Sequence, residues 1–171
     1  MAANSFISVL QINDPRYDVT CYGGFLVELP RRLGTNEALD ASMKAMALSF
    51  PAVYNKQLSY QALDSYGKAL TALRNCLMDQ KKAMTPETLC AIYMISICQG
   101  WVGRKDEQEA AHVLGMVHLL QRAIPMSKLS EFEKAVRRTV GISIVRAVSF
   151  CDTIERLTVN DRSWRVLTIR K

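Results

Sequence analysis

The sequence lacks the residue patterns that mark most enzymes and metalloproteins. Its five cysteines include no Cys-x-x-Cys pair, and its two histidines, His112 and His118, lie six positions apart. On a helix that spacing turns one imidazole about 120° from the other, whereas a shared metal ion needs a spacing of four. No Gly-x-Ser-x-Gly nucleophile elbow occurs, and no phosphate-binding loop follows Gly23 and Gly24. We expect no metal site, no bound cofactor and no catalytic set, so a non-enzymatic chain is the favoured interpretation.

Long hydrophobic runs are also missing. No stretch reaches the roughly 18 consecutive apolar residues of a membrane-spanning helix. Residues 1–10 lack the basic segment and the cleavage site of a signal peptide. An odd number of cysteines, mostly set among apolar residues, is typical of buried free thiols in a reducing compartment. We therefore expect no membrane contact and a location in the nucleus or cytoplasm.

What is present is the composition of one globular domain. The chain has 171 residues, of which 49% are hydrophobic and 22% charged. Residues 1–34 form an irregular lead-in broken by glycine and proline, which we expect to be extended or partly helical, with its apolar residues across the bundle. Residues 35–152 form a helical core, and residues 153–171 a short basic tail. The tail carries five of the basic residues that give the chain its net charge of +6. It can contact an anionic partner such as nucleic acid, or it can simply be solvated.

Five segments combine helical spacing of apolar residues with start or stop signals. They span residues 35–50, 59–78, 85–101, 112–123 and 130–152. The signals are, in chain order, Thr35 or Asn36, Pro51, Thr85 with Pro86, Asp106 with Glu109, Pro125, and Ser130 with Glu133. Residues 79–84 are a polar, basic loop. These patterns predict an all-α fold, an irregular bundle of about five helices joined by short loops.

Two of these segments have informative apolar patterns. Segment 59–78 is the clearest amphipathic stretch, and the residues that we place on its apolar face are Leu63, Tyr66, Leu70, Leu73 and Leu77. Segment 85–101 is apolar nearly all round, which predicts the centre of the bundle. After Asp152 the β-branched residues favour strands, but two short strands form no stable sheet, so we expect coil, a short helix or a partner-paired tail.

Aromatic residues and a histidine in these segments suggest a ligand site. Tyr66, Tyr93, Trp101 and His112 lie on three different predicted helices, so a bundle can bring them around one apolar small molecule. The same residues can equally be ordinary core side chains. We take these four as candidate ligand-binding residues.

Several short sequence runs follow one another along the chain. Their order is a more specific signal of a protein family than any single run. They are Tyr-Gly-Gly-Phe-Leu-Val-Glu-Leu-Pro-Arg-Arg-Leu-Gly at 22–34, Asn-Glu-Ala-Leu-Asp-Ala at 36–41, Ser-Tyr-Gly-Lys-Ala-Leu at 65–70, Leu73-Arg74, Thr88-Leu89, Trp101, His-Val-Leu-Gly at 112–115 and Leu-Leu-Gln-Arg at 119–122. This succession resembles the fungal-specific transcription factor domain, the helical regulatory region of fungal zinc-cluster activators. It covers about residues 22–125, so the last segment and the tail lie outside it.

The resemblance implies a regulatory module that acts through protein contacts, as a homodimer or with other partners, and that can sense a small molecule. This chain lacks the family's six-cysteine zinc cluster, so we expect no sequence-specific DNA binding. One alternative is a stand-alone relative that binds or converts a metabolite in a fungal biosynthetic pathway, which needs a cavity near Trp101 and His112 with a polar group directed inward. A secreted scaffold is disfavoured by the missing signal peptide and the unpaired cysteines.

Overall fold

The protein is predominantly helical in the part that its computed structural model describes, residues 2–102, 107–121 and 126–150. No strand occurs there, so the expected all-α fold is confirmed. The α-helices are α1 (Ala2–Leu10), α2 (Glu37–Ser49), α3 (Ala52–Asn55), α4 (Tyr60–Met78), α5 (Gln80–Ala83), α6 (Pro86–Val102), α7 (Glu107–Leu120) and α8 (Glu131–Phe150). Three 3-10 helices accompany them, η1 (Val19–Tyr22), η2 (Gly24–Arg32) and η3 (Met126–Lys128).

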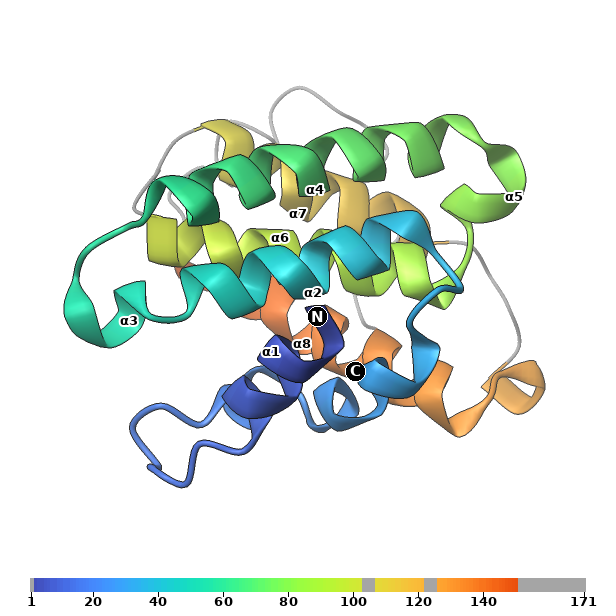
Figure 1. Ribbon diagram of the computed structural model, residues 1–171. Helices are drawn as coiled ribbons and strands as arrows, with labels where there is room; N and C mark the ends of the chain where they lie inside the picture. Colours follow the sequence, from blue (N-terminus) through green and yellow to red (C-terminus); the bar gives the residue numbers. More distant parts are fainter. Residues whose placement is uncertain (1, 103–106, 122–125, 151–171) are drawn as a thin grey trace.

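The helices form an irregular bundle around α6. Helices α2 and α4 run antiparallel, with α4 along the upper edge in Figure 1, and both pack against α6. Helices α7 and α8 cover other sides of α6, and α1 crosses α2. The end of α2, the start of α4 and the end of α6 therefore lie at the same end of the bundle (Figure 1).

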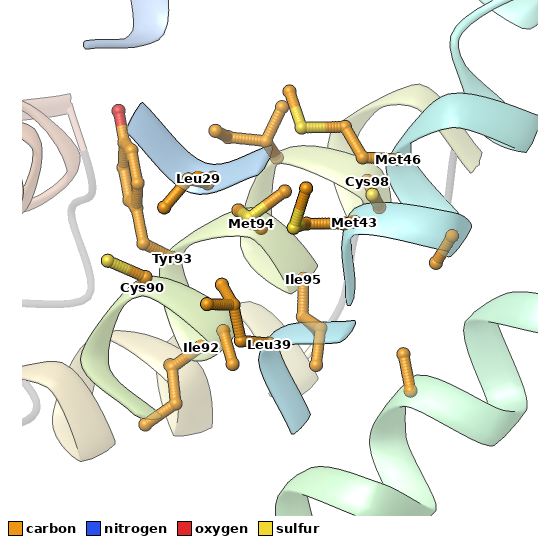
Figure 2. Packing of buried hydrophobic residues seen from close by; sticks show 14 of the residues in the cluster. Leu29, Leu39, Met43, Met46, Cys90, Ile92, Tyr93, Met94, Ile95 and Cys98 are labelled. Atoms are coloured by element: carbon orange, nitrogen blue, oxygen red, sulfur yellow. The ribbon is translucent and has the colours of Figure 1, made fainter. Parts of the chain in front are cut away.

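Helix α6 is the centre of the core, as its apolar pattern predicted. Every residue from Thr88 to Ile95 is buried, so this stretch of helix meets protein on all sides. Figure 2 shows Met94 of α6 meeting Met43 of α2, with Leu29 of η2 beside them. A fully enclosed helix of this kind depends on its neighbours for stability and not on an amphipathic face of its own.

Three helix starts predicted from the sequence are confirmed by their hydrogen bonds. Asn36 Oδ1 accepts the backbone N–H groups of the second and third residues of α2, at 3.0 and 3.1 Å. Ser59 Oγ accepts the N–H of Ala62 at 3.1 Å. Ser130 and Glu133 form the predicted capping box of α8, with Glu133 Oε2 2.9 Å from the Ser130 nitrogen and the Glu133 nitrogen 3.3 Å from Ser130 Oγ.

The lead-in is partly helical, which is one of the two forms that we expected. Residues 2–10 form α1, and residues 19–32 form two 3-10 helices. Its apolar side chains lie across the bundle, as predicted, and the buried ones in this segment are Phe6, Val9, Val19, Phe25, Leu26 and Leu29. The described part of this segment thus contributes to the core.

Other boundaries also need correction. Residues 79–84 are not a plain loop, because Asp79 Oδ1 accepts the N–H groups of Lys81 and Lys82 and starts the single turn α5. Helix α7 begins at Glu107, five residues before His112, and ends at Leu120 instead of Ala123. Cys76, Cys90 and Cys98 are buried free thiols, as predicted, but Cys21 is exposed. Cys151 and the strand-like tail lie outside the described residues.

The buried face of α4 is rotated from the one that we predicted. The side chains that it buries are Ala62, Ser65, Tyr66, Ala69, Leu73 and Cys76. Leu63 and Leu77, which we placed on that face, are exposed, and Leu70 is only partly buried. The three leucines therefore form one flank of α4, beside the core and not within it.

Candidate functional site

The four candidate ligand residues do not form one site among the contacts that the structure describes. Tyr93 and Trp101, both on α6, are joined through Tyr22 of η1. Tyr66 lies in the buried face of α4. His112 is half-buried on α7, and this burial lowers the pKa of its imidazole. The structure thus brings together two of the four residues, and it does so through a residue that sequence reasoning had not selected.

Tyr93 ties three elements together through its hydroxyl group. The hydroxyl donates to the backbone carbonyl of Tyr22 at 2.5 Å and accepts from Ser143 Oγ of α8 at 3.2 Å. Its ring packs 6.1 Å from the ring of Phe25, centroid to centroid. Burial raises the pKa of the Tyr93 phenol, although the Ser143 hydrogen bond opposes that shift. The phenol is neutral, and its hydroxyl both donates and accepts a hydrogen bond. Tyr93 therefore has a structural role, because it holds η1, α6 and α8 together.

Trp101 belongs to a row of aromatic rings at one end of the bundle. Its indole Nε1 donates to the Tyr22 hydroxyl at 3.2 Å. Its ring packs against the rings of Tyr22 and Phe50, with centroid distances of 5.7 and 5.6 Å, and both ring pairs are T-shaped. Tyr54 and Tyr17 extend the row beyond Phe50, at 5.9 and 5.5 Å. These contacts explain the position of Trp101 by packing within the chain.

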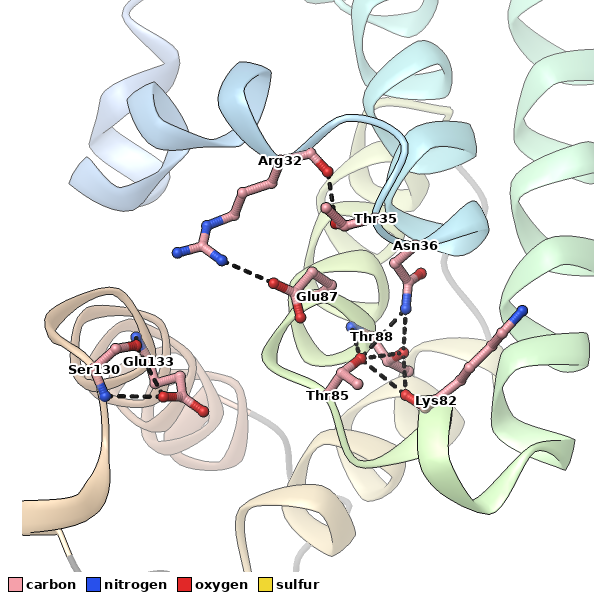
Figure 3. A network of polar contacts seen from close by, with 9 residues as sticks. All are labelled: Arg32, Thr35, Asn36, Lys82, Thr85, Glu87, Thr88, Ser130 and Glu133. Carbon is pink, nitrogen blue, oxygen red and sulfur yellow. Dashed lines mark hydrogen bonds and ion pairs between the residues drawn. The ribbon is translucent and has the colours of Figure 1, made fainter.

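The starts of α2 and α6 meet in a buried polar network (Figure 3). The amide Nδ2 of Asn36 donates to Thr88 Oγ1 at 3.0 Å and to Thr85 Oγ1 at 3.3 Å. Both threonine hydroxyls donate to the backbone carbonyl of Lys82, at 2.7 and 2.9 Å. The Cys76 thiol lies 3.7 Å from Asn36 Oδ1. These groups satisfy one another, so the network fixes two helix starts and has a structural role.

Arg32 links η2 to α6 and α8. Its guanidinium pairs with Glu87 Oε1 at 2.9 Å (Figure 3), and its central carbon lies 3.5 Å from the ring centroid of Phe132. The side chain is about a third exposed, so solvent weakens the ion pair, while the stacking on Phe132 holds the planar group in place. This arrangement also has a structural explanation.

Two hollows on the described surface involve α8, and neither is lined by any of the four candidate residues. One lies between α6, α7 and α8 beside Pro86 and Leu119, with a volume of about 10 Å³. That volume is about one water molecule and is too small for a metabolite. The other is an open groove over α8 alone, lined by Arg137, Arg138, Gly141, Ile142, Val145 and Arg146.

The groove over α8, which we call the α8 face, presents apolar side chains to solvent between arginines. Ile142 is 59% exposed and Val145 is 64% exposed, although both are aliphatic. Arg138 and Arg146 are exposed one turn to either side. The opposite side of the same helix packs inward through Phe132, Val136 and Val140. Helix α8 therefore has a second apolar surface with a cationic border.

No chemical centre emerges elsewhere in the described part of the chain. Within it, no group of three or more histidine, cysteine or acidic side chains lies close enough to hold a metal ion. Burial raises the pKa of the Cys90 and Cys98 thiols far above their usual range, so these side chains remain neutral and unreactive. No helix among these residues is long and apolar enough to cross a membrane.

No family model, no curated protein and no solved structure matches this chain. The fold and the surfaces of the chain are therefore interpreted from its own residues. On those grounds the α8 face is the strongest candidate functional surface, because two aliphatic side chains, Ile142 and Val145, are more than half exposed there.

Proposed function

We propose that the chain is a regulatory module that works by protein contacts, the helical region of a fungal transcription regulator without a DNA-reading element of its own. The observation that carries the protein-contact part is the α8 face, where Ile142 and Val145 are exposed between arginines. Arginine is enriched in protein interfaces, and the fully buried centre of an interface is more apolar than its polar rim.

The charge of the α8 face specifies the kind of partner. Beyond the first turn of α8, the charged residues with described side chains are Lys134, Arg137, Arg138 and Arg146, all of them basic. An amphipathic helix whose apolar side chains are flanked by carboxylates is complementary to this surface. Helices of that composition are suited to electrostatic attraction followed by apolar burial, which gives a reversible regulatory contact.

The regulatory part of the proposal is supported by the order of short runs between Tyr22 and Arg122, which resembles the fungal-specific transcription factor domain. On this proposal the protein works in the nucleus, in the control of genes such as those of secondary metabolism, and homodimers are expected. A likeness in fold or order does not fix function, so the proposal needs a functional readout.

A tethering assay tests the proposal. The chain is fused to an unrelated DNA-binding domain in a fungal reporter strain, and reporter transcription is compared with that of the DNA-binding domain alone. We expect a several-fold change, because a module that recruits partners acts wherever it is placed. Equal transcription from the two proteins at equal abundance would contradict the regulatory function.

The alternative, a metabolite-binding protein or enzyme, requires a cavity beside Trp101 and His112. Trp101 packs against Phe50 and Tyr22, and its indole nitrogen is already used by Tyr22. Native mass spectrometry of the protein purified from fungal cells separates the two proposals. A retained small molecule that is lost on Trp101→Ala replacement would favour the alternative.

A further inference from the structure

The outward face of α4 carries a second unusual surface. Six exposed residues lie along it at alternating spacings of four and three, namely Tyr60, Asp64, Gly67, Thr71, Arg74 and Met78. Residues at these spacings form one line along a helix. Tyr60 is 83% exposed and Met78 is 77% exposed. Helix α4 lies at the edge of the bundle, and its contacts are with α2, α5 and α6 on its other sides (Figure 1).

The six residues are arranged symmetrically about Ala69, the middle residue of α4. Tyr60 and Met78 are equally far from it, and so are Asp64 and Arg74, and Gly67 and Thr71. A two-fold axis at Ala69 therefore places each residue level with its counterpart on an antiparallel second helix. The three pairs are an aromatic ring with a thioether, an acid with a base, and two small side chains.

We propose that the chain self-associates by packing α4 antiparallel against α4 of a second copy. Each Asp64 then meets Arg74 of the other copy, and each Tyr60 ring meets a Met78 thioether, a favourable sulfur–aromatic contact. Gly67 lies near the centre, where a small residue lets two helices approach closely. A Cβ added at Gly67 would meet no atom within 4 Å, so the space above it is open to a second helix.

The leucine flank of α4 extends the same contact. Leu63 and Leu77 are exposed and Leu70 is partly buried, all three on one side of the outward line. The two-fold axis keeps this flank on the same side in both copies, so Leu70 faces Leu70 of the other copy and Leu63 approaches Leu77. Burial of these side chains adds apolar stabilisation to the ionic contacts.

Charge favours a second copy in this one orientation. In a parallel pair each Asp64 would face another Asp64, and each Arg74 another Arg74, which is repulsive. Within one chain Asp64 pairs with Lys68 at 2.6 Å, but both side chains are exposed, so the pair contributes little and leaves Asp64 available. The α8 face differs, because two copies of it would oppose arginine to arginine.

A contact through one helix of each copy is smaller than a standard interface of roughly 800 Å² per partner, so we expect a weak, concentration-dependent dimer. This inference extends the homodimer expected under the proposed function. Its test measures oligomeric state alone. A monomeric result would therefore not contradict the proposed regulatory function, and a negative reporter assay would not contradict the dimer.

Charge reversal tests the pairing. Sedimentation velocity of the full chain over a range of concentrations compares wild type with Asp64→Arg, with Arg74→Asp, and with the double variant. We expect each single change to weaken dimerisation about tenfold or more, because it brings like charges together, and the double variant to restore it. Lys44→Asp, a charge reversal at an exposed residue of α2, is the matched control and should leave dimerisation unchanged.

Gly67→Leu separates dimerisation from folding. Leucine has a higher helix propensity than glycine, so thermal unfolding of the monomer should be unchanged or shifted upward while dimerisation is lost. A wild-type chain that stays monomeric at high concentration would overturn the proposal. So would a dimer that survives Gly67→Leu, or a double charge reversal that fails to restore the dimer.

Discussion

The hydroxyl group of Tyr93 donates a hydrogen bond to the backbone carbonyl of Tyr22, 71 residues earlier in the chain, at a distance of 2.5 Å. This contact fastens the N-terminal segment to the central helix, and Ser143 of α8 joins it through the same hydroxyl. The 3-10 segments are thereby held over the core. Both hydrogen bonds are made by one atom, the hydroxyl oxygen of Tyr93.

Tyr93→Phe should destabilise the fold by about 1–2 kcal/mol, because it leaves the Tyr22 carbonyl without its donor and keeps the ring in place. Urea denaturation followed by circular dichroism measures the change in the free energy of unfolding. Tyr54→Phe, at a more exposed ring of the aromatic row, is the matched control and should change it by less than about 0.5 kcal/mol. A Tyr93→Phe variant as stable as the control would show that these hydrogen bonds contribute nothing.

Asn36→Ala should cost more than the loss of an ordinary helix cap. It removes the cap of α2 and also leaves Thr85 and Thr88 without their shared amide donor. We expect a loss of about 2–3 kcal/mol in the free energy of unfolding, against about 1 kcal/mol for Ser59→Ala, which removes a cap alone. Equal losses for the two variants would mean that the buried network adds no stability beyond capping.

Gly23 and Gly24 are adjacent in the chain, but only Gly23 lacks space for a Cβ atom. Gly23 has a φ of +152°, and a Cβ there would lie 2.9 Å from Thr139 Cγ2 of α8, whereas a Cβ on Gly24 meets nothing within 4 Å. We expect Gly23→Ala to destabilise the fold by about 1–3 kcal/mol and Gly24→Ala to be neutral within about 0.5 kcal/mol. Thermal unfolding of the pair decides this, and a harmless Gly23→Ala would contradict the close approach of η2 and α8.

The stability of the fold should depend on pH through His112. Burial lowers the pKa of His112 below its usual value of 6.5, so below about that pH the unfolded chain binds a proton that the native chain does not. The free energy of unfolding should therefore decrease as the pH falls from about 6.5 through the lowered native pKa. His112→Gln removes the titrating imidazole and should reduce this dependence.

Local signals predicted much of the fold. The starts of α2, α6 and α8 depend on hydrogen bonds between residues three apart, which Asn36, Thr85 and Ser130 indicate in the sequence. Helix α1 was missed, because it has no acidic residue in its first turn and no basic residue in its last. Its stability comes from burying Phe6 and Val9 in the core, and that contact is tertiary.

Periodicity alone placed the face of α4 incorrectly. We predicted the buried face from the leucines at positions 63, 70 and 77, whereas the structure buries smaller residues such as Ala62 and Ala69. Close packing of α4 against α2 and α6 favours small side chains there, a preference that a hydrophobicity pattern does not register. The leucines left outside the core are the ones that we assign to the second copy.

The candidate site was predictable only in part. Trp101 and Tyr93 were selected from the sequence, but their common partner Tyr22 is 79 and 71 residues away, and a single sequence gives no sign of such a pairing. The α8 face was also missed, because the sequence from Arg137 to Arg146 predicts a helix but does not show which side of that helix is buried. Exposure of Ile142 is a property of the assembled bundle.

The central claim is that the chain acts through partner contacts made by the α8 face. The most direct measurement is reporter transcription by the tethered chain carrying Ile142→Glu and Val145→Glu together, compared with Val27→Glu, which places one glutamate at an exposed apolar residue of η2. We predict that the α8 double variant loses the reporter response at unchanged abundance and thermal stability, while Val27→Glu keeps it. A full response from the double variant would contradict the account.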